Sequence, residues 1–169
     1  MPIVREETPE DHEAITNLNR LAFGGNEEAE LVDRLRNTTL VVVSIIAVEG
    51  TEIVGHILFS DLPIEIEQGV IDAVSLTAMS VSPKCQRQGI GSALVRKGLD
   101  ICRERGKSIV VVLGHPQHYP RFGFSAELAK NLFGPFSGDA WMALELKKGA
   151  LDNVKWTVQY PEAFGVLNH

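Results

Sequence analysis

The spacing of hydrophobic residues near the start of the chain predicts one strand and then two helices. Ile3 to Glu6 has the length of a short opening strand, and Thr8 to Asp11 contains capping and first-turn residues that begin helices. A helix is expected after them because apolar side chains recur at spacings of three and four, at Ile15, Leu18 and Ala22. Gly24-Gly25 ends this helix, and a shorter one is expected from Glu27 to Arg36.

The middle of the chain is rich in β-branched residues, which are typical of strands. Leu40 to Val48 and Ile53 to Phe59 are two such stretches, and the turn residues Gly50-Thr51 between them predict a hairpin. Val70 to Val81 is expected to be one further strand. Pro83 cannot donate a backbone hydrogen bond, so this strand should end near Val81.

An amphipathic helix is expected from Gly89 to Arg105, because most of its apolar residues share one face. Ile109 to Leu113 follows as a continuous apolar run, which is typical of a strand covered on both faces. This strand-helix-strand unit predicts parallel strands with a right-handed crossover. After Tyr119 to Phe124 and a Gly/Pro-rich loop, Trp141 to Leu146 and Lys155 to Tyr160 are the expected final strands. The fold class is therefore α/β with a mixed sheet.

Composition narrows the possibilities for the chain as a whole. The 169 residues are 44% hydrophobic and 22% charged, as in an ordinary globular protein, and we expect one domain spanning residues 1–169. The net charge of −6 without a basic stripe argues against nucleic acid as a partner. No apolar run reaches the ~20 residues that a membrane helix needs, and the N-terminus lacks a signal-peptide centre. We therefore expect no membrane association and a cytoplasmic location.

The two cysteines are expected to be free thiols. Neither Cys85 nor Cys102 has a second Cys or a His at metal-ligand spacing, so no metal site is expected. Neither has an activating partner nearby in the sequence, and no nucleophilic role is expected for them.

The segment Gln86-Arg87-Gln88-Gly89-Ile90-Gly91 predicts an anion site. It lies where a strand has ended and a helix begins, and the first amides of a helix have no acceptors within the helix. Those amides and the positive end of the helix dipole suit a diphosphate, and two glycines let the backbone come close to it. The alternative is that the glycines only form a tight turn between strand and helix.

Two familiar phosphate motifs do not fit this chain. A dinucleotide-binding fingerprint would need a third glycine at the position of Leu94. Gly106-Lys107-Ser108 resembles the end of a Walker A loop, but the first glycine of that motif would fall at Ile101. It also follows a helix and precedes a strand, which is the reverse of the required order.

Three motifs together resemble the GNAT superfamily of N-acetyltransferases, and within it the predicted acetyltransferases of the YhbS type. They are Leu76 to Pro83, Gln86 to Leu94 and Tyr119-Pro120-Arg121-Phe122-Gly123-Phe124. The resemblance covers roughly residues 40 to 146. It implies the GNAT fold and an acyltransferase that moves the acetyl group of acetyl-CoA to a primary amine of a small molecule or peptide, by direct attack in a ternary complex.

The same resemblance implies where the cofactor lies. The strands that end at Val81 and Leu113 are expected to splay apart, and the pantetheine arm is expected to pair with backbone groups of Met79, Ser80 and Val81. The pyrophosphate is expected to be held by the amides of Arg87, Gln88, Gly89, Ile90, Gly91 and Ser92. An amide near Met79 would stabilise the oxyanion, and Tyr119 corresponds to the family tyrosine that donates a proton to the departing sulfur.

The remaining roles stay open at this point. Tyr119 could instead be a loop tyrosine with its ring in the core. The general base has four candidates, namely Asp61, Asp72, His115 and His118. The chain departs here from GNAT members that carry an Asn and a full helix after this strand. His56, on an apolar strand, is expected to be a core residue.

The sequence also leaves the acceptor, the acyl group and the assembly undecided. A rival hypothesis is a non-catalytic acyl-CoA-binding sensor or interaction module, which would need the same cofactor residues. A homodimer through exposed edges of the final strands is a further expectation.

Overall fold

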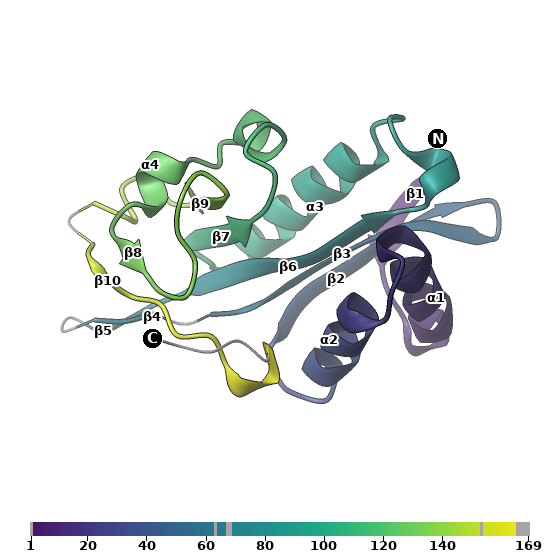
Figure 1. The fold of residues 1–169 in the computed structure, drawn as a ribbon, viewed down its shortest axis with the longest axis horizontal. Coiled ribbons are helices and arrows are strands. Elements are labelled where there is room, and N and C mark those ends of the chain that lie inside the picture. Colours follow the sequence, from purple (N-terminus) through teal and green to yellow (C-terminus); the bar gives the residue numbers. More distant parts are fainter. Residues whose placement is uncertain (1, 63, 67–68, 153, 165–169) are drawn as a thin grey trace.

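The computed structural model describes residues 2–62, 64–66, 69–152 and 154–164 (Figure 1). Its helices are α1 (His12–Phe23), α2 (Glu27–Arg36), α3 (Ile90–Glu104) and α4 (Ala126–Ala129). Its strands are β1 (Ile3–Glu6), β2 (Val41–Glu49), β3 (Glu52–Asp61), β4 (Ile64–Ile66), β5 (Gly69–Ile71), β6 (Ala73–Val81), β7 (Ile109–Leu113), β8 (Leu132–Phe133), β9 (Trp141–Glu145) and β10 (Trp156–Thr157).

Six strands form one mixed sheet in the order β1-β2-β3-β6-β7-β9. β6 and β7 are parallel, as the sequence predicts for the two strands joined by α3, and the other neighbouring pairs are antiparallel. The expected hairpin is β2 and β3, and its turn contains Gly50 at a φ of 64°. The mixed α/β class and the main strand-helix-strand unit are thus confirmed.

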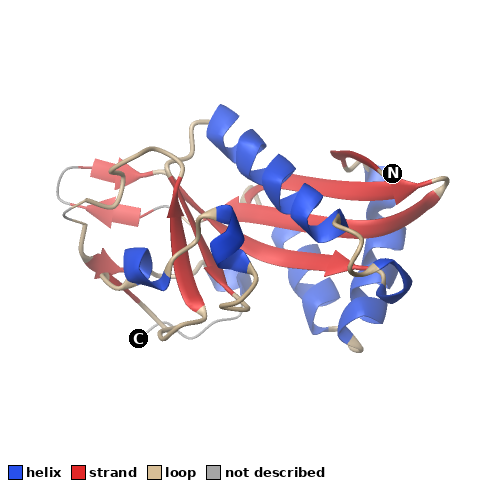
Figure 2. Cartoon of the chain, turned by 90° about the horizontal axis from the view of Figure 1, so that it is seen from above, coloured by secondary structure: helices blue, strands red, loops and turns tan. Residues whose placement is uncertain are grey.

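Helices cover both faces of the sheet. α3 lies on one face, and α1 and α2 lie on the other (Figure 2). One hydrophobic core joins α3 to the sheet through Ile90, Leu94 and Leu99, and a second core contains Val32 and Leu35 of α2. No helix in the described ranges has the length and apolar character needed to cross a membrane.

The pairing of β6 with its two neighbouring strands is irregular on both sides. In the pairing with β3, Leu58 is opposite Ala78 and Phe59 is opposite Leu76, so Thr77 is the extra residue of a β-bulge. The pairing of β6 with β7 reaches only from Ala73 to Ser75. Beyond that point the two strands separate, which confirms the splay that the resemblance implied.

One predicted strand is in fact two. Val70 to Val81 is divided at Asp72, because β5 turns away to pair with β4 in a separate two-stranded sheet, and only β6 joins the main sheet. Asp is disfavoured inside strands, and here the Asp72 carbonyl accepts a hydrogen bond from Ser108 N (2.8 Å). The short strand β4 was not predicted.

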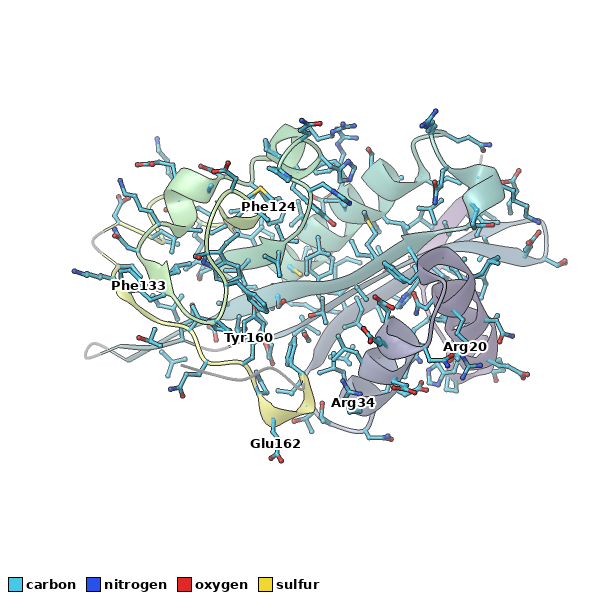
Figure 3. The ribbon with its side chains drawn as sticks, viewed as in Figure 1. Arg20, Arg34, Phe124, Phe133, Tyr160 and Glu162 are labelled. Carbon is cyan, nitrogen blue, oxygen red and sulfur yellow. The ribbon has the colours of Figure 1, made fainter. Side chains whose placement is uncertain are left out.

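The prediction of a final strand at Lys155 to Tyr160 is confirmed only for β10, and its place in the main sheet is wrong. Only β10 is extended there, and it pairs with β8 outside the main sheet. Tyr160 packs edge-on against Phe164 with ring centroids 5.0 Å apart, and Arg34 Nε donates to the carbonyl oxygen of Ala163 (2.9 Å), so this segment runs across to α2 (Figure 3). Its apolar side chains cover a face of the sheet instead of extending an edge.

The edges of the main sheet are therefore β1 and β9. The outer edge of β9 is partly covered, because Ser125 and Ala143 exchange two backbone hydrogen bonds of 2.9 and 3.0 Å. A dimer through the final strands, as the sequence suggested, would have less free edge than expected.

A polar network centred on Glu7 attaches the helices to the sheet. The Glu7 carboxylate accepts hydrogen bonds from Arg36 Nε (3.1 Å) and Nη2 (3.0 Å) and from the Ser44 hydroxyl, and His12 Nε2 lies 2.7 Å from it. Ser44 Oγ is also 2.9 Å from Nε2 of the fully buried His56. His56 is thus a core residue, as expected, although its Nδ1 has no partner among the described residues.

This network predicts a dependence of stability on acid. Burial opposes the charge of Glu7, but its contacts with His56, Arg36 and Ser44 outweigh burial and lower the pKa of the carboxyl far below its ordinary value of 4.5. The unfolded chain therefore takes up the proton first, so the contribution of Glu7 to the free energy of unfolding is present above pH 4.5 and is lost as the pH falls below it.

Glu7→Gln should accordingly lower the free energy of unfolding at pH 7 by about 3 kcal/mol, because Arg36 loses a buried partner. The free energy of unfolding of the Glu7→Gln variant should also fall less steeply than that of the wild type between pH 5 and pH 3. Urea denaturation at several pH values measures both effects. Glu52→Gln breaks the exposed pair with Lys84 and should change the free energy by no more than ~0.5 kcal/mol. Equal losses in the two variants would refute the role of Glu7.

Candidate active site

A cavity of about 840 Å³ lies where β6 and β7 separate. Its walls come from the second half of β6, the end of β7, the turn before α3 and the start of α3. The ends of α1 and α2 that face each other close it from the other side of the sheet. The cavity therefore reaches both faces of the sheet through the opening between the two strands.

The turn before α3 has the backbone shape of an anion site. Arg87 has a φ of 66° and is the one non-glycine residue with positive φ in the described chain, and Gly89 has a φ of 82°. Consecutive amides in such a turn point into a shared concavity, and a strained residue of this kind is typical of functional sites. The first backbone hydrogen bond into the helix joins Ala93 N to Gly89 O (3.0 Å), so the preceding amides have no acceptor in the helix.

The residues predicted to hold the cofactor converge on this cavity. Gly91, at the start of α3, faces β6, and a Cβ built there would lie 3.7 Å from Val81 Cγ2 and 3.9 Å from Met79 Cε. The side-chain amide of Gln86 donates to the Val81 carbonyl (3.3 Å) and links the turn to the end of the strand. Of the predicted cofactor residues, all line the cavity except Gln88, namely Met79, Ser80, Val81, Arg87, Gly89, Ile90, Gly91 and Ser92.

Tyr119 lines the cavity from the loop after β7. Its ring packs edge-on against Phe124 at 5.6 Å and against His118 at 5.0 Å. A Cβ on Gly114 would lie 2.4 Å from the ring, so only glycine leaves room for the tyrosine in this position. Burial raises the pKa of the Tyr119 phenol, which therefore keeps its proton at neutral pH.

Two of the four candidate bases line the cavity, and the other two do not. His115 and His118 line the cavity, and the carbonyl of His115 accepts the amide hydrogens of His118 (3.1 Å) and Tyr119 (3.3 Å), which shapes the loop. Burial lowers the pKa of His118 and favours its neutral form, but its Nε2 is enclosed and has no partner among the described residues. Asp61 pairs with Lys107 (2.8 Å), and neither Asp61 nor Asp72 lines the cavity.

The two cysteines are both buried and free. Burial raises the pKa of the Cys102 thiol to about 12, so it stays protonated and unreactive. Cys85 also lines the cavity, which the sequence did not indicate. Within the described ranges, no three His, Cys, Asp or Glu side chains are grouped so that they could hold a metal ion.

Sequence reasoning missed the wall formed by the first two helices. Ala22, Phe23 and Glu28 line the cavity, although they lie far from β6 in the chain. The available signal was the glycine pair Gly24-Gly25, which ends one helix just before the next begins. Two helix ends joined so closely must lie side by side, but nothing in the sequence indicates which part of the sheet they face.

The chain is similar to known acetyltransferases in sequence. The family model of the acetyltransferase (GNAT) domain matches residues 3–126. The uncharacterized N-acetyltransferase YhbS of Escherichia coli strain K12 is 32% identical over 165 residues, which cover 96% of this chain and 98% of that protein. The uncharacterized N-acetyltransferase YjhQ of the same strain is 34% identical over 116 residues, which cover 68% of this chain and 64% of that protein.

Two crystal structures show the same similarity in three dimensions. YhbS from Escherichia coli in complex with CoA has a TM-score of 0.88 and 31% identity, and the match covers 98% of this chain and 92% of that one. A GNAT family acetyltransferase from Brucella melitensis in complex with acetyl-CoA has a TM-score of 0.80 and 31% identity, and the match covers 97% and 98% of the two chains.

Proposed function

The chain belongs to the GNAT family of acetyltransferases, and we propose that it transfers the acetyl group of acetyl-CoA to a primary amine by direct attack in a ternary complex. The family makes it an acyltransferase, and its similar crystal structures hold CoA and acetyl-CoA. The cavity between β6 and β7 carries the proposal, because it joins an anion-binding turn to a buried tyrosine through a gap in the sheet.

The residues of the cavity fit coenzyme A. The turn at Arg87 and Gly89 presents free amides and one cationic side chain to a diphosphate. The edge of β6 that faces β7 pairs with no described strand after Ser75, which leaves backbone groups of Met79, Ser80 and Val81 for the amides of a pantetheine arm. Gln88 lies in the turn, and its backbone amide would bind the diphosphate while its side chain would not.

Acetyl-CoA supplies a thioester, whose carbonyl carbon is attacked by the amine nitrogen as the C–N bond forms. The bulge at Thr77 interrupts the ladder beside Met79, and we assign an unpaired amide of this stretch to the carbonyl oxygen as negative charge develops there. Such a donor acts mainly in the transition state, where the charge is largest.

Two proton transfers complete the reaction. The attacking nitrogen gives up a proton, and we assign its acceptor to His115, which lines the cavity and is exposed, whereas His118 has its Nε2 enclosed. As the C–S bond breaks, the Tyr119 phenol donates its proton to the departing thiolate. Exchange with solvent then returns the imidazole and the phenol to their starting states, and the products are an amide and free CoA.

Thiol release separates this function from the rival one, a non-catalytic acyl-CoA sensor. The protein is mixed with acetyl-CoA and a panel of primary amines, and free CoA is measured with a thiol reagent. An enzyme should release CoA much faster with at least one amine than without any. Tight CoA binding with no amine-dependent release across the panel would favour the sensor.

We also propose a cytoplasmic location and a homodimer. The two buried free thiols support a cytoplasmic protein. The outer edge of β1, where Ile3 is exposed, pairs with no strand in the described part of the chain and supports a homodimer through that edge in place of the final strands.

A further inference from the structure

Side chains of both charges line the cavity. Arg87 and the amides before α3 provide positive charge at the turn, and Arg121 lines the cavity from the loop after β7. On the side of α1 and α2, Glu28 provides a carboxylate, and no other Asp or Glu among the described residues lines the cavity. The proposed function assigns the coenzyme diphosphate to the turn before α3, so the carboxylate on α2 belongs to the part of the cavity left for the acceptor.

Glu28 differs from its neighbours on the same helix. It is half-buried, whereas Glu27 and Glu30 are exposed and do not line the cavity. Within the described chain, Glu28 has no ion pair or hydrogen bond, although other glutamates such as Glu7 and Glu52 are paired with cations. A half-buried carboxylate without a protein partner in a cavity is suited to a cationic ligand.

Exposed apolar side chains also line the cavity. Phe23 is 45% exposed and Leu113 is 47% exposed, and both line the cavity. Large apolar side chains exposed together in a cavity mark a binding surface, because a ligand can bury them. Phe23 comes from the end of α1 and Leu113 from the end of β7, so they approach the gap from opposite sides of the sheet.

Building on the proposed function, we propose that Glu28, Phe23 and Leu113 form the acceptor subsite and select a small primary monoamine with an apolar carbon skeleton. Glu28 binds the ammonium group of the incoming amine, and the skeleton packs between Phe23 and Leu113. Glu28 determines specificity only. The ammonium loses its proton before the nitrogen attacks the thioester, and that proton leaves through the base and not through Glu28.

Three small amines test the two parts of the subsite. Phenethylamine has the ammonium and the apolar group, ethanolamine lacks the apolar group, and phenylalanine adds a carboxylate that Glu28 should repel. The wild type should acetylate phenethylamine with a kcat/KM at least about 10-fold above that of the other two. Ethanolamine lacks the large apolar group whose burial accounts for such a factor, and phenylalanine carries a carboxylate close to Glu28. Initial rates of CoA release at saturating acetyl-CoA measure the three values.

Two variants and two matched controls assign the effect to residues. Glu28→Gln should raise the KM for phenethylamine about 10-fold with little change in kcat. It should also lower the ratio of the kcat/KM for phenethylamine to the kcat/KM for phenylalanine. Phe23→Ala should lower the ratio of the kcat/KM for phenethylamine to the kcat/KM for ethanolamine. Glu27→Gln, beside Glu28 but outside the cavity, and Phe133→Ala, equally exposed but elsewhere, should leave all three values unchanged.

The outcomes separate this inference from the proposed function. If the protein binds CoA but acetylates no amine, the proposed function fails. If it acetylates the three amines equally well, or if Glu28→Gln behaves as Glu27→Gln does, the function stands and the subsite is overturned. Faster acetylation of a peptide with an N-terminal phenylalanine than of phenethylamine would also overturn the assignment to a small monoamine.

Discussion

Tyr119→Phe should lower the kcat of acetyl transfer by about 100-fold or more, because the departing thiolate loses its proton donor. The affinity for CoA should change by no more than about twofold, since the ring keeps its contacts with Phe124 and its place against Gly114. Steady-state rates with a saturating amine give kcat, and calorimetry with CoA gives the affinity.

The chain contains a matched control for this variant. Its only other tyrosine is Tyr160, which is also buried but belongs to the core on the α2 side of the sheet and does not line the cavity. Tyr160→Phe should therefore keep the turnover of the wild type. Full turnover in Tyr119→Phe would remove the phenol from the mechanism and restore the alternative of a loop tyrosine with its ring in the core.

The unit from β6 to β7 could be predicted because its signals are local. A strand stopped by Pro83, a helix begun after Gly89 and an apolar run at β7 each depend on neighbouring residues. The same locality explains why the turn at Arg87 and Gly89 could be proposed as an anion site from the sequence. Backbone geometry there follows from a few adjacent positions.

Features that depend on distant contacts could not be predicted. The bulge at Thr77 shows only in the pairing with β3, since every residue from Ala73 to Val81 is apolar, small or hydroxylated. Val158 and Tyr160 alternate as they would in a strand, but they cover a face of the sheet instead. The division at Asp72 likewise depends on β4, which pairs with β5.

The residues of the site also fall into those predicted from local sequence and those that depend on distant contacts. Cofactor residues could be proposed because they occupy two short segments with recognisable motifs. Phe23 and Glu28 could not, because they reach the cavity only through the packing of α1 and α2 on the sheet. From the sequence alone, Asp61, Asp72 and the two histidines are equal candidates for the general base. Only the structure shows that the two aspartates lie outside the cavity.

Gly91→Leu should weaken CoA binding by about 100-fold, which corresponds to roughly 3 kcal/mol. The side chain would project toward Met79 and Val81, into the space through which the coenzyme must pass. Stability should not suffer, because leucine favours a helix more than glycine does and a Cβ at this position meets only ordinary contacts. Lys97→Leu, on the exposed side of the same helix, is the matched control and should bind CoA as the wild type does.

Calorimetric titration of CoA into the wild type and Gly91→Leu, after thermal melts have shown both to be folded, tests most directly whether the opening beside α3 binds the coenzyme. We expect a saturable one-to-one isotherm for the wild type and an isotherm displaced by about two orders of magnitude for the variant. Equal affinities in two folded proteins, or a wild type that fails to bind CoA at millimolar concentration, would contradict the placement of the coenzyme between β6 and β7.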